Sequence, residues 1–334
     1  MSFGLLLYIG KLYWGTLGLK IVILDGYCLN HGDLSWEKFN TLGEVTLYSR
    51  TPYDKIVERM DNASVMITNK CNIDKHIIDS LKDLKYIGVL ATGYNNVDVN
   101  YAKSRGITVT NIPAYSTESV VQLVFGLIIE LYSGIGYHNA SVQNGDWQNC
   151  PDFCYYKTGM RQLQGKTIGI VGAGKIGLRI KDVAIAFGMN VLLYSRSRHA
   201  KEEGFRYASS LFELYENSDI VSLNCPLDEN NVGMINKEAL SHFRKDAILI
   251  NTARGGLIDE SALANALSSG QLAGAGVDVL SEEPPTKGNP LLTAPNTIIT
   301  PHVAWATIEA RSALMEIAYN NLKSFLNGKP INVV

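Results

Sequence analysis

Three residues suited to acid–base chemistry or to binding a carboxylate stand in the second half of the chain, each just after a predicted strand. They are Arg254 in NTARGG, Glu283 in SEEPP and His302 in TPH. Histidine moves protons near neutral pH, an adjacent carboxylate favours its protonated form, and arginine binds a carboxylate or carbonyl through paired hydrogen bonds. Taken singly, each also fits a structural role, such as a solvated loop arginine. Because ligands bind outside the carboxyl ends of parallel strands, we expect the three at one site.

A glycine-rich turn within residues 166–177, KTIGIVGAGKIG, predicts a binding site for the pyrophosphate of a dinucleotide. The first glycine permits a sharp turn after a strand, the second lets the backbone approach the pyrophosphate, and the third lets helix and strand pack tightly. The free amides at the start of the following helix favour phosphate. The alternative is a glycine turn in an α/β domain that binds no nucleotide. The predicted contact residues are Gly172, Gly174, Lys175, Ile176 and Gly177.

The elements that position these residues form two series of alternating strands and helices, which predict parallel sheets covered on both faces. The expected fold class is α/β with two domains, a doubly wound Rossmann sheet and a smaller, flavodoxin-like parallel sheet for the substrate. Strands of the smaller sheet are expected at 20–24, 45–48, 65–68, 86–90 and 107–111. The six strands of the Rossmann sheet are expected at 167–171, 191–194, 220–223, 247–251, 276–279 and 297–300.

The order of these elements predicts the domain boundaries. A long apolar helix over 117–131, capped by Thr117, is expected to bridge the domains. A last helix over 308–326 is expected to return to the first domain. The expected segments are an N-terminal extension of uncertain order (1–18), a substrate domain (19–115), a dinucleotide-binding domain (116–302) and the returning C-terminal segment (303–334).

The composition argues against several classes of function. The 334-residue chain is 46% hydrophobic and 19% charged, as is typical of a soluble globular protein, and its net charge of −2 gives no reason to expect nucleic acid or an anionic membrane as partner. Five scattered cysteines predict no disulfide framework and a reducing cytoplasm. Cys150 and Cys154 lack a second pair of soft ligands nearby, so we expect free thiols and no metal site.

From Lys20 to Val334 the chain resembles the D-isomer-specific 2-hydroxyacid dehydrogenases. The motifs that carry the resemblance are GAGKIG (172–177), NTARGGLIDE (251–260), GAGVDVLSEEPP (274–285) and TPHVAWAT (300–307). Within the family, LATGYNNVDV (90–99) and the HVAWAT ending are most similar to glycerate dehydrogenases, also called hydroxypyruvate reductases.

The resemblance implies a role for particular residues. The catalytic arginine, glutamate and histidine of the family fall on Arg254, Glu283 and His302. Its substrate-carboxylate loop falls on Thr92, Gly93 and Tyr94, and its nicotinamide-contacting positions fall on Thr117, Ala253 and Asp278, with further cofactor contacts at Cys225, Pro226 and Thr252. The resemblance also implies a homodimer built on the cofactor domains and a cleft between the domains that closes on the substrate.

The segment after the second cofactor strand departs from the commoner family pattern. NAD-preferring members usually carry an acidic residue there, but this chain has Ser195, followed by Arg196 and Arg198. A missing carboxylate removes repulsion, and an arginine can bind a 2′-phosphate. We therefore favour NADP(H) as the cofactor. The alternative is a basic surface loop that tolerates NAD(H).

Together these features predict an oxidoreductase that reduces hydroxypyruvate or glyoxylate to the D-2-hydroxy acid (D-glycerate or glycolate) and runs the reverse oxidation. Asn69 and Lys70 are candidates for contact with the third carbon of the substrate, although a solvated loop fits them equally. Three alternatives remain: phosphoglycerate dehydrogenase, a dinucleotide-sensing corepressor on the same fold, and a methyltransferase that uses the glycine loop. The lack of a regulatory domain disfavours phosphoglycerate dehydrogenase, and the lack of basic tails disfavours the corepressor. The two-domain layout and the three polar residues disfavour the methyltransferase.

Overall fold

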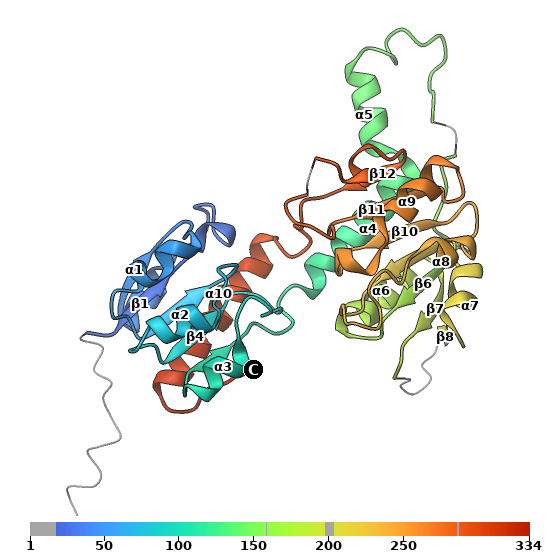
Figure 1. The fold of residues 1–334 in the computed structure, drawn as a ribbon. Helices are drawn as coiled ribbons and strands as arrows, with labels where there is room; N and C mark the ends of the chain where they lie inside the picture. The colour runs from blue at the N-terminus through green and yellow to red at the C-terminus, as the bar shows by residue number, and fades with distance from the viewer. Residues whose placement is uncertain (1–17, 158, 198–203, 286) are drawn as a thin grey trace, which may run out of the picture. The chain divides into compact units, whose positions relative to one another are not determined.

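The computed structural model describes residues 18–157, 159–197, 204–285 and 287–334 (Figure 1). It divides into two compact units. Of the described residues, unit 1 combines 18–115 with Ala306–Val334, and unit 2 lies within Ser116–Trp305. Each unit is built on a parallel sheet, so the expected α/β class with two parallel sheets is confirmed.

Unit 1 contains a five-stranded sheet in the order β2-β1-β3-β4-β5, which is the flavodoxin-like order. Val22, Met66 and Ile87 on one face of the sheet belong to the core formed with α1, α2 and α3, whereas α10 packs on β4. The strands are β1 (Lys20–Ile23), β2 (Glu44–Leu47), β3 (Val65–Thr68), β4 (Tyr86–Val89) and β5 (Thr108–Thr110). The helices are α1 (Ile56–Met60), α2 (Lys75–Ser80), α3 (Val99–Ser104) and α10 (Ile308–Leu326).

Unit 2 contains a seven-stranded parallel sheet in the order β12-β11-β10-β9-β6-β7-β8. Its first six strands in chain order therefore lie in the arrangement 3-2-1-4-5-6 that characterises dinucleotide-binding sheets. The strands are β6 (Thr167–Val171), β7 (Asn190–Tyr194), β8 (Phe205–Tyr207), β9 (Ile220–Leu223), β10 (Ile248–Asn251), β11 (Gly274–Val277) and β12 (Thr297–Ile299). The helices are α4 (Thr117–Ser133), α5 (Ile135–Gln143), α6 (Lys175–Ala186), α7 (Leu211–Glu216), α8 (Lys237–Ser241) and α9 (Glu260–Ser268).

Helices cover both faces of this larger sheet, as the near-continuous apolar strands require. Because successive side chains of a strand point to opposite faces, Ile168 and Ile170 enter one core and Val171 enters the other. The first core also contains the buried side chains of α4 and α6, and the second contains those of α7, α8 and α9. The helix α5 and the loop after it protrude from the body of unit 2 (Figure 1).

Two local predictions were wrong. The larger sheet has seven strands and not six, because β8 pairs with β7 at the edge. This strand has only three residues, too few to show an alternation pattern. Thr117 is not the cap of the long helix: it is the first residue of α4, and Ser116, with a non-helical ψ of 13°, takes the cap position.

No single helix among the described residues is long and apolar enough to cross a membrane. The bent pair α4–α5 meets the length and composition criteria together. Many residues of α4 are buried in the core of unit 2, which accounts for its apolar sequence.

Candidate active site

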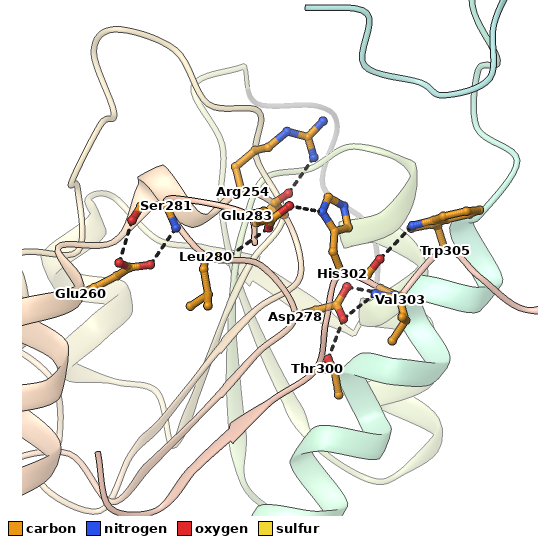
Figure 2. Close-up of polar contacts among 12 residues, drawn as sticks. Arg254, Glu260, Asp278, Leu280, Ser281, Glu283, Thr300, His302, Val303 and Trp305 are labelled. Carbon is orange, nitrogen blue, oxygen red and sulfur yellow. Dashed lines mark hydrogen bonds and ion pairs between the residues drawn. The ribbon is translucent and has the colours of Figure 1, made fainter. Parts of the chain in front are cut away.

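The catalytic candidates of unit 2 lie at one edge of its sheet. The strands β10, β11 and β12 are adjacent and parallel, so the loops that follow them leave from the same edge. Arg254 belongs to the first loop, Glu283 to the second and His302 to the third. Figure 2 shows these three side chains together with Asp278, which directly follows β11.

The side chains of Glu283 and His302 lie close together, and both can carry a charge. The imidazole Nδ1 lies 2.6 Å from Glu283 Oε2, and the other carboxylate oxygen accepts a hydrogen bond of 3.0 Å from the amide of Leu280. The carboxylate is thus held from both sides, and it fixes the orientation of the imidazole ring. About a third of each side chain is exposed, 33% for His302 and 36% for Glu283. The remaining ring nitrogen, Nε2, is the one available to exchange a proton with a substrate.

The backbone of His302 is left-handed, with φ of +54°. This conformation costs a residue with a side chain about 1–2 kcal/mol, so it persists only where the surroundings impose it. The amide of His302 donates to the carbonyl oxygen of Asp278 at 2.8 Å. Asp278 thereby connects the end of β11 to the turn that presents the histidine.

The side chain of Asp278 also organises this turn. It is 1% exposed. Its Oδ1 accepts from the Thr300 hydroxyl (2.6 Å) and the Val303 amide (2.9 Å), and its Oδ2 accepts from the Ala304 amide (2.8 Å). These three bonds satisfy a carboxylate that would otherwise be costly to bury. The nicotinamide contact expected for Asp278 remains a prediction.

The exposed Arg254 lies on a loop whose shape depends on two neighbours, Asn251 and Gly255. The fully buried Asn251 accepts from the Ala253 amide (3.0 Å) and donates to the Arg254 carbonyl (2.9 Å), which closes the loop. A Cβ on Gly255 would lie 1.9 Å from the carbonyl carbon of Leu280, so only glycine lets this loop approach the one that bears Glu283. The guanidinium Nη1 of Arg254 bonds to the Ala253 carbonyl oxygen at 2.7 Å.

The glycine-rich turn has the geometry that a dinucleotide requires. Gly172 has φ of +109°, and a Cβ there would lie 2.6 Å from the carbonyl oxygen of Asn224. A Cβ on Gly177 would lie 2.0 Å from the Gly172 carbonyl oxygen, so both positions demand glycine for internal packing. A Cβ on Gly174 would meet nothing within 4 Å, which leaves open space beside the N-terminus of α6. The turn therefore fits a bound pyrophosphate, with the amides of Lys175 and Ile176 in the first helical turn.

The end of β7 carries the residues expected to select the cofactor. Ser195 follows the strand directly, and Arg196 donates from Nη2 to the carboxylate of Asp228 at 2.8 Å. A hydrogen bond from the Asn230 amide, together with Arg196, lowers the pKa of Asp228, so its carboxylate is charged at neutral pH. Asp228 lies in the loop after β9 and was not expected from the sequence. Arg198 lies outside the described residues.

The other predicted contact residues lie in the following places. Thr117 begins α4, and Thr252 and Ala253 follow β10. Cys225 and Pro226 follow β9, and burial raises the pKa of the Cys225 thiol, which keeps it neutral.

Thr92, Gly93 and Tyr94, the predicted substrate-carboxylate loop, belong to unit 1. The Thr92 hydroxyl donates to the Ile112 carbonyl (2.7 Å), and the Asn111 side chain donates to the Thr92 carbonyl (2.8 Å). Their binding of a substrate carboxylate remains a prediction.

Sequence reasoning missed a supporting residue, Glu260. Its carboxylate accepts from the amide and the hydroxyl of Ser281, both at 2.7 Å (Figure 2). It also accepts from the side chain of Asn289 at 2.9 Å. It thereby anchors the loop that carries Glu283. Nothing local marks this glutamate, because its partners lie 21 and 29 residues away.

Comparison with known proteins agrees with this geometry. Residues 125–304, more than half of the chain, match the family model of the D-isomer specific 2-hydroxyacid dehydrogenase, NAD binding domain. This chain belongs to the D-isomer-specific 2-hydroxyacid dehydrogenase family. A hydroxypyruvate reductase from Blautia hydrogenotrophica is 44% identical over 95% of this chain and 99% of that protein. A glycerate dehydrogenase from Methylorubrum extorquens is 40% identical over 94% of this chain and 98% of that protein.

Two solved structures are similar to this chain over more than nine-tenths of its length. An NADPH-dependent glyoxylate/hydroxypyruvate reductase from Sinorhizobium meliloti superimposes with a TM-score of 0.82, at 28% identity, over 94% of this chain and 97% of that one. A D-lactate dehydrogenase from Lactobacillus jensenii with NAD⁺ superimposes with a TM-score of 0.79 at 28% identity, over 94% of this chain and 99% of that one. These two similar proteins differ in cofactor, since the first is described as NADPH-dependent and the second was solved with NAD⁺.

Proposed function

We propose that this dehydrogenase reduces hydroxypyruvate or glyoxylate to the corresponding 2-hydroxy acid, D-glycerate or glycolate, and catalyses the reverse oxidation. The observation that carries the proposal is the Glu283–His302 pair, 2.6 Å apart at the strand ends of a dinucleotide-binding sheet. The names of the relatives, hydroxypyruvate reductase and glycerate dehydrogenase, support this choice of substrate.

His302 is the proton donor in reduction. Its Nδ1 is held by Glu283, so Nε2 delivers the proton to the carbonyl oxygen of the keto acid and takes it back in oxidation. Glu283 orients the ring and balances the charge of its protonated form. Arg254 polarises the same carbonyl and binds the carboxylate through its planar guanidinium. A bound nicotinamide supplies the hydride chemistry, and the residues placed to hold its dinucleotide are those of the glycine turn and the end of β7.

NADP(H) is the cofactor that we propose, with NAD(H) as the alternative. The basis is Ser195 in place of an acid, with Arg196 beside it. Asp228 holds one nitrogen of the Arg196 guanidinium and so restricts the side chain, while the other nitrogens keep donors for a 2′-phosphate. The likeness to an NADPH-dependent reductase supports the same choice.

A second copy of the chain is the partner that we propose, through the protruding part of unit 2. Trp147, Phe153 and Tyr156 on this segment are 52%, 89% and 73% exposed. Soluble monomers rarely expose aromatic side chains together in this way. We expect a homodimer, so light scattering should give a mass about twice the 36.7 kDa of the chain. A monomer at micromolar concentration would contradict this assignment.

We also assign the protein to the cytoplasm, because all five of its cysteines are free thiols. Cell fractionation checks this assignment, and recovery of the protein in an oxidising compartment would contradict it.

The substrate is tested by steady-state reduction of a panel of carbonyl compounds with NADPH and NADH. We expect the highest kcat/KM with hydroxypyruvate or glyoxylate. A matched ketone without the carboxylate should react at least about a hundredfold more slowly, because a site built to bind a charged group rejects an analogue that lacks it. A clear preference for the phosphorylated keto acid would replace this proposal with a phosphoglycerate dehydrogenase, and no turnover of any keto acid would point to a sensor.

A further inference from the structure

We propose that Trp305 is a positioning residue for His302, which it holds through the carbonyl group of that histidine. The indole Nε1 donates to the His302 carbonyl oxygen at 2.9 Å (Figure 2). This inference rests on the proposed role of His302 as proton donor. Trp305 acts on the backbone of the histidine and not on the reacting atoms.

The bond matters because it completes the restraint on one peptide plane. The peptide between His302 and Val303 has its N–H bound to Asp278 Oδ1 at 2.9 Å and its carbonyl bound to the indole. With both ends held, the ψ angle of His302 is fixed, while the bond from its own amide to Asp278 restrains φ at +54°. These two angles set the direction in which the side chain leaves the backbone.

The position of Trp305 in the chain makes this restraint necessary. Trp305 is the last residue of unit 2, so the chain leaves this unit directly after the catalytic turn. Ala304, just before it, is tied to α4 through its carbonyl, which accepts from the Ser119 hydroxyl at 2.5 Å. The indole bond extends this anchorage back to the histidine. Without it, an intrinsically unfavourable left-handed residue near the end of the unit is free to relax.

The contact between His302 and Glu283 depends on the direction in which the His302 side chain leaves the backbone. The Nδ1–Oε2 distance of 2.6 Å requires the ring to leave the backbone toward the loop after β11. A small rotation of the peptide plane moves Nε2 as well, and a misplacement of about 1 Å can cost about a hundredfold in rate. Loss of the indole donor should therefore impair proton transfer and leave dinucleotide binding intact.

The test replaces Trp305 with phenylalanine, which keeps an aromatic ring and removes the N–H. We expect kcat for keto acid reduction to fall about tenfold, and the Kd of the preferred cofactor, measured by calorimetry, to stay within twofold. The solvent isotope effect on kcat should rise, because a misplaced donor makes proton transfer more rate-limiting. A merely structural defect that lowers the fraction of active enzyme leaves the solvent isotope effect unchanged.

The control is Trp36→Phe, which removes an indole N–H in unit 1. It should leave kcat, the cofactor Kd and the solvent isotope effect as in the wild type.

A double-mutant cycle decides whether Trp305 acts through the histidine. In a His302→Asn background, Trp305→Phe should cause no further loss of kcat, because the group it positions is gone. Equal losses in both backgrounds, or wild-type turnover and isotope effect in Trp305→Phe, would overturn the proposal. If His302→Asn itself keeps wild-type turnover, the proposed function fails instead. Should Trp305→Phe not fold, benzothienylalanine at position 305, which replaces only the N–H by sulfur, gives the same comparison.

Discussion

Replacing His302 with asparagine is expected to lower kcat for keto acid reduction by about 10²–10⁴, which is the usual contribution of general acid–base catalysis. Asparagine can still donate a hydrogen bond, but it cannot deliver a proton to the carbonyl oxygen. The Kd of the preferred cofactor should change less than twofold, because His302 lies on the loop after β12 and not in the glycine turn. Steady-state kinetics with hydroxypyruvate and calorimetry with the cofactor measure the two quantities.

A second histidine pair of unit 2 provides the matched control. His242 Nδ1 lies 2.7 Å from Glu216 Oε1, almost the same geometry as His302 and Glu283, but between α7 and the end of α8. His242→Asn should leave kcat within about twofold, as expected for a surface pair with little energetic weight. Near-wild-type turnover in His302→Asn would remove that residue from the mechanism. An equal loss in both variants would mean that the effect comes from stability.

The cofactor preference should reverse when the end of β7 is rebuilt with Ser195→Asp and Arg196→Ala. The wild type is expected to favour NADPH over NADH in kcat/KM by about tenfold or more, since a hydrogen bond to a charged group contributes roughly 1.5–3 kcal/mol and 1.4 kcal/mol is about tenfold. In the double variant the new carboxylate repels the 2′-phosphate and accepts from the ribose hydroxyls. The ratio of kcat/KM for the two cofactors at fixed hydroxypyruvate is the measurement.

Arg206 supplies the control for this second prediction. It lies on β8, next to β7, and its guanidinium pairs with Glu213 at 2.6 Å. Arg206→Ala removes an exposed arginine and one ion pair from the strand beside β7. It should nevertheless leave the ratio of kcat/KM for NADPH and NADH unchanged. A wild type that prefers NADH would show that Arg196 serves only Asp228, and the NADP(H) assignment would then be withdrawn.

The sequence by itself determined the α/β architecture and the positions of most strands. Fully buried strands such as β9 and β10 are short, mostly apolar runs, and this local property does not depend on what the strands pair with. The glycine turn could also be predicted from the sequence, because the positive φ of Gly172 and the tight packing at Gly177 exclude other residues. The polar residues after β10, β11 and β12 were also visible, since they directly follow apolar segments.

Tertiary structure alone decided how these residues are held. Neither the left-handed backbone of His302 nor its bond to the Trp305 indole can be inferred from the letters TPHVAW, because the turn is held by hydrogen bonds to Asp278, which follows another strand. The pairing of Arg196 with Asp228 joins loops 32 residues apart. Such contacts depend on which loops leave the sheet beside one another and how closely they approach. The order of the strands decides which loops are neighbours, and this order exists only once the whole sheet has formed.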